Sequence, residues 1–236
     1  MLLRLLLTAA VAGLSLSACG ATASDDAFGQ KVRAYLIEHP EVLEEALTKL
    51  QEKKALAEAA NVSQAIAANR KALIADARDP VIGNPKAAIT VVEFFDYRCG
   101  YCKSAAPEVL ALVSAENDVR LVLKEMPILS PQSELAARMA LAAAQQGKYP
   151  PVHRALMAER ALDDAAIARI AQANGVDLAK ADASAVNTHI ADVHKLAEAI
   201  QVTGTPAFIV GDQMIAGADI AGLKAAIAKQ RSATPT

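Results

Sequence analysis

Two cysteines separated by two residues, Cys99 and Cys102, mark where this chain could do chemistry. They follow an apolar run at residues 89–95 that predicts a buried strand, and they open a predicted helix. Two thiols at this spacing can close a small disulfide ring, and the unpaired N–H groups and dipole of a helix start stabilise a thiolate on the first sulfur. The spacing therefore predicts a redox site, with Cys99 as nucleophile and Cys102 as resolving thiol.

A cysteine pair of this kind can also form half of a structural zinc site, which takes four protein ligands. The only other cysteine is Cys19, and zinc-finger spacing is missing among the four histidines, His39, His153, His189 and His194. We interpret the last three histidines as surface or helix-packing residues. We therefore expect no metal and no cofactor beyond a redox-active disulfide between the paired cysteines.

The composition argues against nucleic acid as a partner. A net charge of −2 with 21% charged residues offers no basic surface. Tryptophan is absent and aromatic residues make up 3% of the chain, so stacking on bases is not expected either. At 236 residues the chain has room for one domain and an extension.

The first 23 residues have the pattern of a signal peptide, with an apolar core at residues 5–16 that is too short to span a bilayer. Residues 16–19, Leu-Ser-Ala-Cys, look like a bacterial lipobox that would leave Cys19 as a lipidated N-terminus. Ala-Thr-Ala at residues 21–23 fits ordinary cleavage instead. We favour the lipoprotein because it accounts for the odd cysteine, and we expect export in either case.

Residues 24–79 are helical in pattern, and from residue 41 they contain neither glycine nor proline. An apolar stripe repeats at helical spacing, formed by Val42, Leu43, Ala46, Leu47 and Leu50. The stripe either packs on its own domain or joins a second copy of the chain. Leucines at heptad spacing favour the second, although the repeat is not sustained. Asn61 and Ser63 are a candidate break in this helix.

A βαβ unit is expected around the paired cysteines. Residues 79–85, rich in turn formers, predict a link before the strand at residues 89–95. Residues 103–116 predict a helix bent by Pro107, and residues 119–124 predict a second strand. Strand, helix and strand at this length indicate parallel pairing.

The rest of the chain predicts a helical block and a hairpin. Residues 132–201 are alanine-rich and helical, without a credible strand. Residues 207–210 and 214–216 predict two antiparallel strands joined at Gly211-Asp212, and residues 219–229 predict a closing helix.

In this order the elements resemble the thioredoxin fold with an inserted helical domain, as in the periplasmic DsbA-like thiol–disulfide oxidoreductases of bacteria. The resemblance covers about residues 81–230 and is carried by the cysteine helix, the helical block and Thr205-Pro206 before the hairpin. It implies an α/β fold with a thioredoxin-like domain at residues 80–130 and 201–236 and a helical insertion at residues 131–200.

The N-terminal region resembles one branch of that superfamily. Residues 38–47, Glu-His-Pro-Glu-Val-Leu-Glu-Glu-Ala-Leu, are similar to the N-terminal segment of ScsC, the suppressor-of-copper-sensitivity branch. In that branch the N-terminal helices can drive oligomerisation and the protein can act as a disulfide isomerase. The resemblance implies a homo-oligomer held together through residues 24–79.

Two details of the predicted site differ from the DsbA pattern. Gly-Tyr between Cys99 and Cys102 resembles the isomerase DsbC, whereas DsbA-type oxidases carry Pro-His. Thr205 stands where those oxidases usually have valine. Because Gly-Tyr places no cation beside Cys99, we expect the pair to be less oxidising than that of DsbA.

Glu93 is a further candidate catalytic residue. Both faces of its strand are apolar, so the carboxylate is expected to be buried, which is costly unless it is paired or protonated. The family carries an acid six positions before the first cysteine, which implies proton exchange with Cys102. The alternative is an edge-strand glutamate that reaches solvent, and Lys124 is a candidate partner.

X–Pro bonds are cis in only about 5–6% of cases, but the resemblance implies a cis Pro206 that faces the cysteines. The backbone of Thr205 would then bind substrate as an added strand, and Gly204 would allow its close approach. Tyr101 and Tyr97 flank the thiols, where they form an apolar landing surface for substrates or are partly buried.

These features predict an exported disulfide isomerase or reductase that acts on unfolded or misoxidised proteins through a mixed disulfide on Cys99. The resemblance implies a periplasmic location, lipid-anchored or soluble, and a membrane electron donor of the DsbD or ScsB type. Two alternatives stay open. One is a monomeric dithiol oxidase, and the other is a copper-tolerance protein that binds Cu(I) through both thiolates.

Overall fold

The computed structural model describes residues 22–233, so most of the predicted signal peptide, Cys19 included, lies outside the described residues. The chain divides between Leu56 and Ala57 into two compact units. None of the helices among the described residues is both long enough and apolar enough to cross a membrane.

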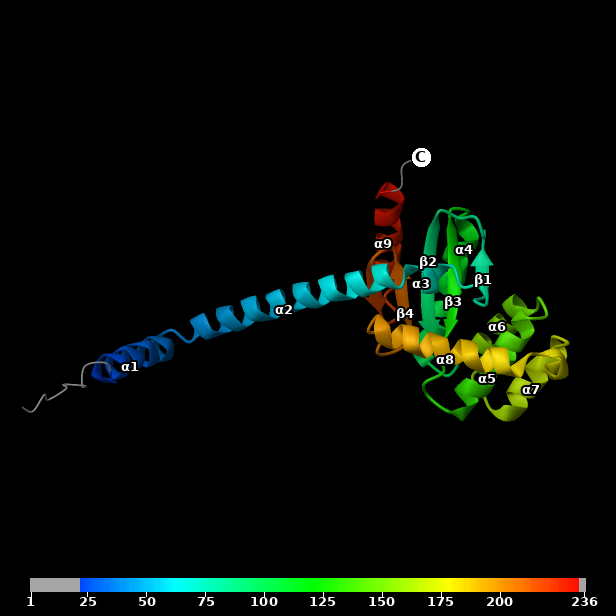
Figure 1. The fold of residues 1–236 in the computed structure, drawn as a ribbon, viewed down its shortest axis with the longest axis horizontal. Helices are drawn as coiled ribbons and strands as arrows, with labels where there is room; N and C mark the ends of the chain where they lie inside the picture. The colour runs from blue at the N-terminus through cyan, green and yellow to red at the C-terminus, as the bar shows by residue number, and fades with distance from the viewer. Residues whose placement is uncertain (1–21, 234–236) are drawn as a thin grey trace, which may run out of the picture. The chain divides into compact units, whose positions relative to one another are not determined.

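The first unit is helical, as the sequence predicts (Figure 1). Helix α1 spans Thr22–Glu38, and α2 spans Glu41–Ala68 and so continues into the second unit. Pro40 precedes α2, where its missing N–H costs little, and its carbonyl accepts a hydrogen bond from the Leu43 N–H at 3.0 Å.

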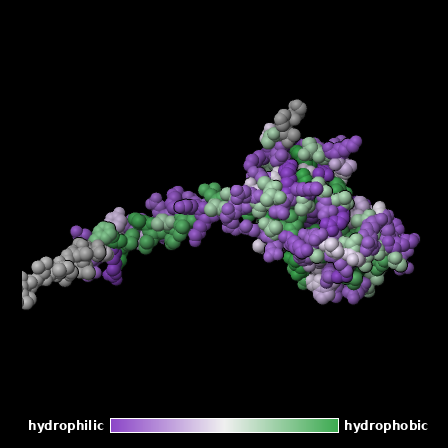
Figure 2. Space-filling model, viewed as in Figure 1, coloured by the Kyte–Doolittle hydropathy of each residue, from purple (hydrophilic) through white to green (hydrophobic). Residues whose placement is uncertain are grey.

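The apolar side chains of this unit are largely exposed. Hydrophobic side chains gather along α1 and the first turns of α2 (Figure 2). The exposed set consists of Phe28, Val32, Tyr35, Ile37, Leu43, Leu47, Leu50 and Leu56, with exposed fractions from 40% to 73%. We call these residues the N-terminal stripe.

The second unit begins inside α2. The break predicted at Asn61 and Ser63 is wrong, because the helix runs through both residues. It ends at Ala68, and the short helix α3 (Arg70–Ile74) follows. At this junction the side-chain amide of Asn69 donates to the carbonyl of Ala65 at 2.9 Å, where the chain turns out of α2.

Residues after Leu56 pack with the sheet. Ile66 and Leu73 are 2% and 1% exposed and share a core with Val92 and Phe94. The observed division therefore lies well before the link at residues 79–85, because the last turns of α2 and all of α3 bury apolar side chains in the second unit.

Among the residues that the structure describes, five strands form one sheet in the order β1-β3-β2-β4-β5 (Figure 1). Their bounds are Val81–Gly83 for β1, Ile89–Phe95 for β2, Val119–Glu125 for β3, Ala207–Val210 for β4 and Gln213–Ala216 for β5. The predicted parallel pairing of β2 with β3 and the predicted hairpin of β4 with β5 are both confirmed.

Strand β1 lies within residues 79–85, where the sequence predicts a link without a strand. Val81–Gly83 pairs antiparallel with β3, with Gly83 opposite Arg120. Gly83 has a φ of +92°, and a Cβ there would lie 2.6 Å from Cγ1 of Val113. Three residues between prolines carry no strand periodicity, so the sequence predicts only turns here.

Helices cover both faces of the sheet. Helix α4 (Gly100–Ala115) connects β2 to β3, and α9 (Ile220–Ala233) packs with it in the larger core. The predicted helical insertion is confirmed as α5 (Pro131–Ala144), α6 (Tyr149–Ala158), α7 (Asp164–Ala173), a 3-10 turn (Leu178–Lys180) and α8 (Ala183–Ala199). Helix α8 packs in the second core, with Val92 and Phe94.

Candidate active site

The two thiols lie at the start of α4, as predicted. Cys99 is the N-cap residue, with extended backbone, and Cys102 lies in the first turn. Both are free thiols, 7% and 0% exposed. The Cys99 Sγ also donates to the carbonyl of Thr205, at 3.2 Å.

The loop before β4 completes this arrangement. The peptide bond between Thr205 and Pro206 is cis, as the resemblance implies. The carbonyl of Pro206 accepts a hydrogen bond from the Gly217 N–H at 2.8 Å, which fixes the loop to the end of β5. Space beside Gly204 is open, since an added Cβ would meet no heavy atom within 4 Å. Thr205 itself, whose carbonyl faces Cys99, is half-buried.

Cys102 needs a base to ionise. Burial raises the pKa of its thiol well above the usual range, and the charges of Cys99 and Glu93 raise it further. The Cys102 thiol therefore holds its proton until a neighbouring group accepts it.

Glu93 is a buried acid near this thiol. It is 2% exposed, its Oε1 has no hydrogen-bond partner, and burial raises its pKa to about 8. The edge-strand alternative is wrong, because β2 lies between β3 and β4. The predicted pairing with Lys124 is also wrong, since Leu123 stands opposite Glu93 and Lys124 therefore points to the other face.

Asp96 is a residue that the sequence analysis missed. It is 1% exposed, and its carboxylate accepts hydrogen bonds from the backbone N–H groups of Arg98 at 2.7 Å, Ile128 at 2.8 Å and Leu129 at 3.0 Å. It therefore ties the turn before Cys99 to the loop after β3.

The two predicted tyrosines differ sharply in exposure. Tyr101, between the cysteines, is 71% exposed, whereas Tyr97 is 1% exposed. The Tyr97 hydroxyl donates to Oε1 of Glu125 at 2.9 Å, and the Tyr149 hydroxyl donates to the same oxygen at 2.7 Å. His153, which is buried on α6, lies 3.0 Å from the Tyr97 hydroxyl.

Glu125 and Tyr149, which form a buried polar cluster with Tyr97 and His153, were not predicted from the sequence. Glu125 ends β3 directly beside Phe95, the last residue of β2. Parallel strands end at the same edge of a sheet, so the position of Glu125 at a strand end was a usable signal. Tyr149 carries no such signal, because it reaches the cluster from the helical insertion.

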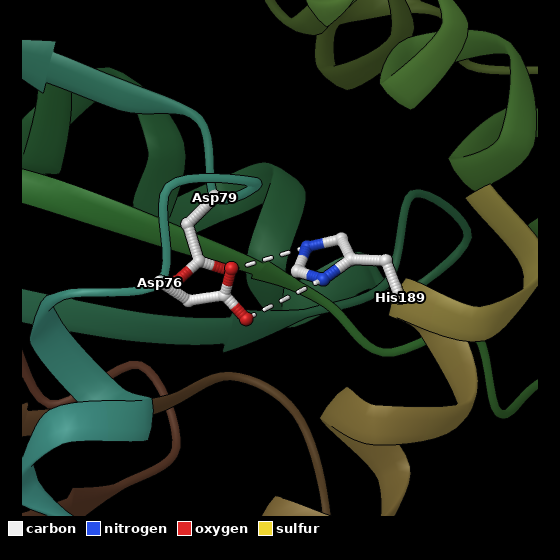
Figure 3. Close-up of side chains that lie close together, drawn as sticks. All are labelled: Asp76, Asp79 and His189. Atoms are coloured by element: carbon white, nitrogen blue, oxygen red, sulfur yellow. Dashed lines mark ion pairs between the residues drawn. The ribbon is translucent and has the colours of Figure 1, made fainter. Parts of the chain in front are cut away.

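A second buried polar cluster joins α8 to the link before β1. His189 points its ring at Asp79 and Asp76, with Nε2 3.2 Å from Asp79 Oδ1 and Nδ1 4.0 Å from Asp76 Oδ2 (Figure 3). These residue types could hold a metal ion. Lys124 is ion-paired with Asp79, however, and Arg78 with Asp76 at 2.6 Å, so both carboxylates are already neutralised. We assign the cluster to packing between these elements.

Comparisons with known proteins agree with this geometry. The solved structure of a thioredoxin-like oxidoreductase from Silicibacter pomeroyi DSS-3 is 43% identical, with a TM-score of 0.66, and the match covers 70% of this chain and 99% of that one. Proteus mirabilis ScsC in a transitional conformation is 28% identical, with a TM-score of 0.69, covering 90% and 99%. The thiol:disulfide interchange protein DsbA of Bordetella pertussis is 34% identical over 61% of this chain and 75% of its own length.

The chain also matches Na+/H+ antiporters NhaA of Salinispora species, of whose length it spans 24%. The family model of the copper resistance protein ScsC N-terminal domain matches residues 26–57, and that of the DSBA-like thioredoxin domain matches residues 90–228, more than half of the chain. The chain therefore belongs to the DSBA-like thioredoxin domain family, among the thiol–disulfide oxidoreductases of the DsbA and ScsC type.

Proposed function

We propose that this protein is a disulfide isomerase or reductase that acts on misoxidised exported proteins. One observation carries the proposal: two cysteine side chains at the start of α4, the first of them against the carbonyl of Thr205. In this arrangement an extended substrate would lie along the backbone of Thr205, with its disulfide within reach of the Cys99 sulfur.

The reaction follows from thiol chemistry. The Cys99 thiolate attacks one sulfur of a substrate disulfide, forming a mixed disulfide and releasing the other substrate sulfur as a thiolate. In isomerisation a substrate thiolate attacks the mixed disulfide, forms a new substrate disulfide and returns Cys99 to the thiolate. In reduction the Cys102 thiolate attacks the Cys99 sulfur of the mixed disulfide instead, the Cys99–Cys102 disulfide forms, and the substrate leaves with both sulfurs reduced.

Glu93 supplies the base for the second route. In its ionised form it takes the proton of the Cys102 thiol, which then attacks as a thiolate. Its burial without a hydrogen-bond partner supports this role, because the ionised form is poorly solvated and accepts a proton readily.

The surface beside the thiols suits unfolded chains. Tyr101 is exposed next to Cys99, and Ile128 and Leu129 are 45% and 54% exposed in the loop that Asp96 holds. A groove of about 490 Å³ runs from Ile128 to Thr203, just before the cis proline loop. Apolar contacts of this kind accept many sequences, as a general isomerase requires.

The N-terminal stripe supports self-association. Eight large apolar side chains on α1 and α2 are 40% to 73% exposed, which is unusual for a surface that remains in water. The match of residues 26–57 to the ScsC N-terminal domain falls on the same segment. Association of copies would bring several redox sites to one substrate.

Location and electron donor follow from the same reasoning. A solved relative from Salmonella enterica serovar Typhimurium is described as a periplasmic thioredoxin-like protein, and we propose the periplasm here too, with Cys19 as a lipid anchor. An isomerase works with reduced cysteines, so a membrane electron donor of the DsbD or ScsB type would keep Cys99 and Cys102 reduced.

The test is refolding of scrambled ribonuclease. We expect the mature protein to restore ribonuclease activity, Cys99→Ser to abolish the recovery, and a variant that starts at residue 57 to keep thiol reactivity but lose most of the recovery. The cut at residue 57 preserves the buried residues Ile66 and Leu73. Activity on reduced ribonuclease alone, by a monomer, would identify a dithiol oxidase instead.

The ScsC match also favours a second candidate, Cu(I) binding by the paired thiolates. Two sulfur ligands suit this soft ion. Titration of the reduced protein with Cu(I) under anaerobic conditions should show one ion per chain, lost in Cys102→Ser. Uptake well below one ion per chain would contradict it.

A further inference from the structure

A buried polar cluster beside the redox site has no part in the reaction above. It consists of Tyr97, Glu125, Tyr149 and His153, which are 1% to 3% exposed. Tyr97 follows β2, Glu125 ends β3, and the other two lie on α6. Four buried polar side chains from three elements are costly to bury unless they satisfy one another.

Hydrogen bonds close the cluster. Oε1 of Glu125 accepts from both tyrosine hydroxyls, at 2.7 and 2.9 Å. Nδ1 of His153 lies 3.0 Å from the Tyr97 hydroxyl and 3.4 Å from that of Tyr149. The His153 ring also meets Phe95 edge-on, with centroids 5.2 Å apart, which seals the cluster on the side of β2.

These contacts allow two proton arrangements. With Glu125 ionised, both hydroxyls donate to it, so Nδ1 of His153 must carry the proton and donate to a tyrosine oxygen. With Glu125 protonated, its carboxyl group can donate, and a hydroxyl is freed to donate to an unprotonated Nδ1. Burial lowers the pKa of His153 to about 3, so the ring stays neutral and only its tautomer changes. Taking up one proton thus rearranges the whole cluster.

The cluster lies within electrostatic reach of the redox site. Glu93 is paired with Leu123 of β3, so Glu125, two residues further on, lies on the same face of the sheet as Glu93. Burial, together with smaller contributions from the charges of Asp96 and Glu93, raises the pKa of Glu125 to about 8. The charge of Glu93 also raises the pKa of Tyr97. Arg154 is the further charged group that acts on the cluster, through His153. Repulsion is mutual, so an ionised Glu125 opposes ionisation of Glu93.

A mechanical link accompanies the electrostatic one. Tyr97 lies two residues before Cys99. The ammonium of Lys103, in the first turns of α4, donates to the carbonyls of Leu156 and Glu159 at 2.8 Å each. The helix that carries Tyr149 and His153 is therefore fastened to the helix that carries the thiols.

We propose that Glu125, held by Tyr97, Tyr149 and His153, is a positioning residue that stores a proton and thereby sets how readily Glu93 accepts the proton of Cys102. The proposal rests on the proposed function. While Glu125 is ionised, its charge opposes the ionisation of Glu93. While Glu125 is protonated, Glu93 ionises at lower pH. The protonation state of Glu125 therefore determines the pH at which Glu93 can take the proton of Cys102.

The test uses Glu125→Gln, which keeps the acceptor oxygen and removes the charge. Cys99 is first coupled to a chromogenic aromatic thiol, and the release of that thiol by Cys102 is timed from pH 5 to pH 10. We expect the midpoint of the pH–rate profile to fall by about one unit, with the plateau rate unchanged, because Glu93 no longer meets a second negative charge. Glu134→Gln, an exposed acid on α5 paired with Arg138, should leave the midpoint unchanged.

Tyr97→Phe provides an independent variant. It removes a hydrogen bond to ionised Glu125, keeps that group neutral to higher pH, and should lower the midpoint in the same direction. A midpoint unchanged in both variants, or a rate altered equally at every pH, would overturn the inference. Wild-type protein that never releases the aromatic thiol, or releases it equally as Cys102→Ser, would overturn the proposed function itself.

Discussion

Large apolar side chains are exposed to water in the N-terminal stripe, whereas carboxyl groups are buried at the end of the sheet beside the cysteines. Leu47 on α2 is 58% exposed, while Glu93 and Glu125 are 2% and 1% exposed. Each region departs from the usual placement of its residue type. The stripe needs a covering surface, and the buried acids need a proton or a hydrogen-bond donor.

The difference shows that burial must be interpreted together with partners. Asp96 is as buried as Glu93, yet three backbone N–H groups satisfy its carboxylate. Glu93 has an unsatisfied oxygen at a similar depth. Only the second arrangement favours proton exchange, because in the first the backbone N–H groups already occupy both carboxylate oxygens. The following changes in free energy of unfolding test this contrast.

The largest effect is expected from Lys124→Met. Its ammonium pairs with Asp79 and donates to the carbonyl of Ala72, and both charged groups are 1% exposed. Removing it leaves a buried carboxylate without its cation, which costs about 3–5 kcal/mol. Urea unfolding of the variant that starts at residue 57 would measure the loss.

The matched control for this change is Lys224→Met, which breaks an exposed pair with Glu108 at 3.7 Å and should cost less than about 1 kcal/mol. Lys124→Met combined with Asp79→Asn should recover part of the loss, since no unpaired charge remains. Equal losses from the two lysine variants would show that burial does not distinguish these ion pairs.

A smaller effect is expected from each unit of pH. The folded pKa of Glu93 is raised to about 8, so between the ordinary glutamate value and pH 8 the folded state binds a proton that the unfolded state has lost. Stability should therefore fall as pH rises through this window, by about 1.4 kcal/mol per unit for one acid, and level off above it. Urea unfolding at pH 5, 7 and 9 would measure the slope.

Glu93→Gln should remove one acid's share of that slope and make the protein more stable than wild type at pH 9. Glu125→Gln should act similarly, because burial raises the pKa of that acid to about 8 as well. A slope identical in Glu93→Gln and wild type would mean that Glu93 does not titrate in this window.

Prediction from sequence succeeded where one short segment determines the outcome. Residues 89–95 are apolar on both faces, a pattern that predicts a fully buried strand. The start of the next helix follows from the position of Cys99. It failed where distant segments meet. The direction of Lys124 depends on strand register, and the partner of Glu125 comes from α6, so neither can be inferred from neighbouring residues.

The smallest change in stability is expected from Leu47→Lys, in the N-terminal stripe. Because this side chain is 58% exposed, the substitution should alter the free energy of unfolding of the second unit by less than about 0.5 kcal/mol. It should nevertheless lower the mass of the protein in solution, measured by light scattering, because a charge in an apolar contact between copies is costly to bury.

Leu73→Ala is the matched change in the core: this leucine is 1% exposed, and its truncation should cost about 2–5 kcal/mol without altering the mass. If Leu47→Lys left the mass unchanged, the stripe would not be the contact between copies. Some other surface would then have to cover the apolar side chains of the stripe.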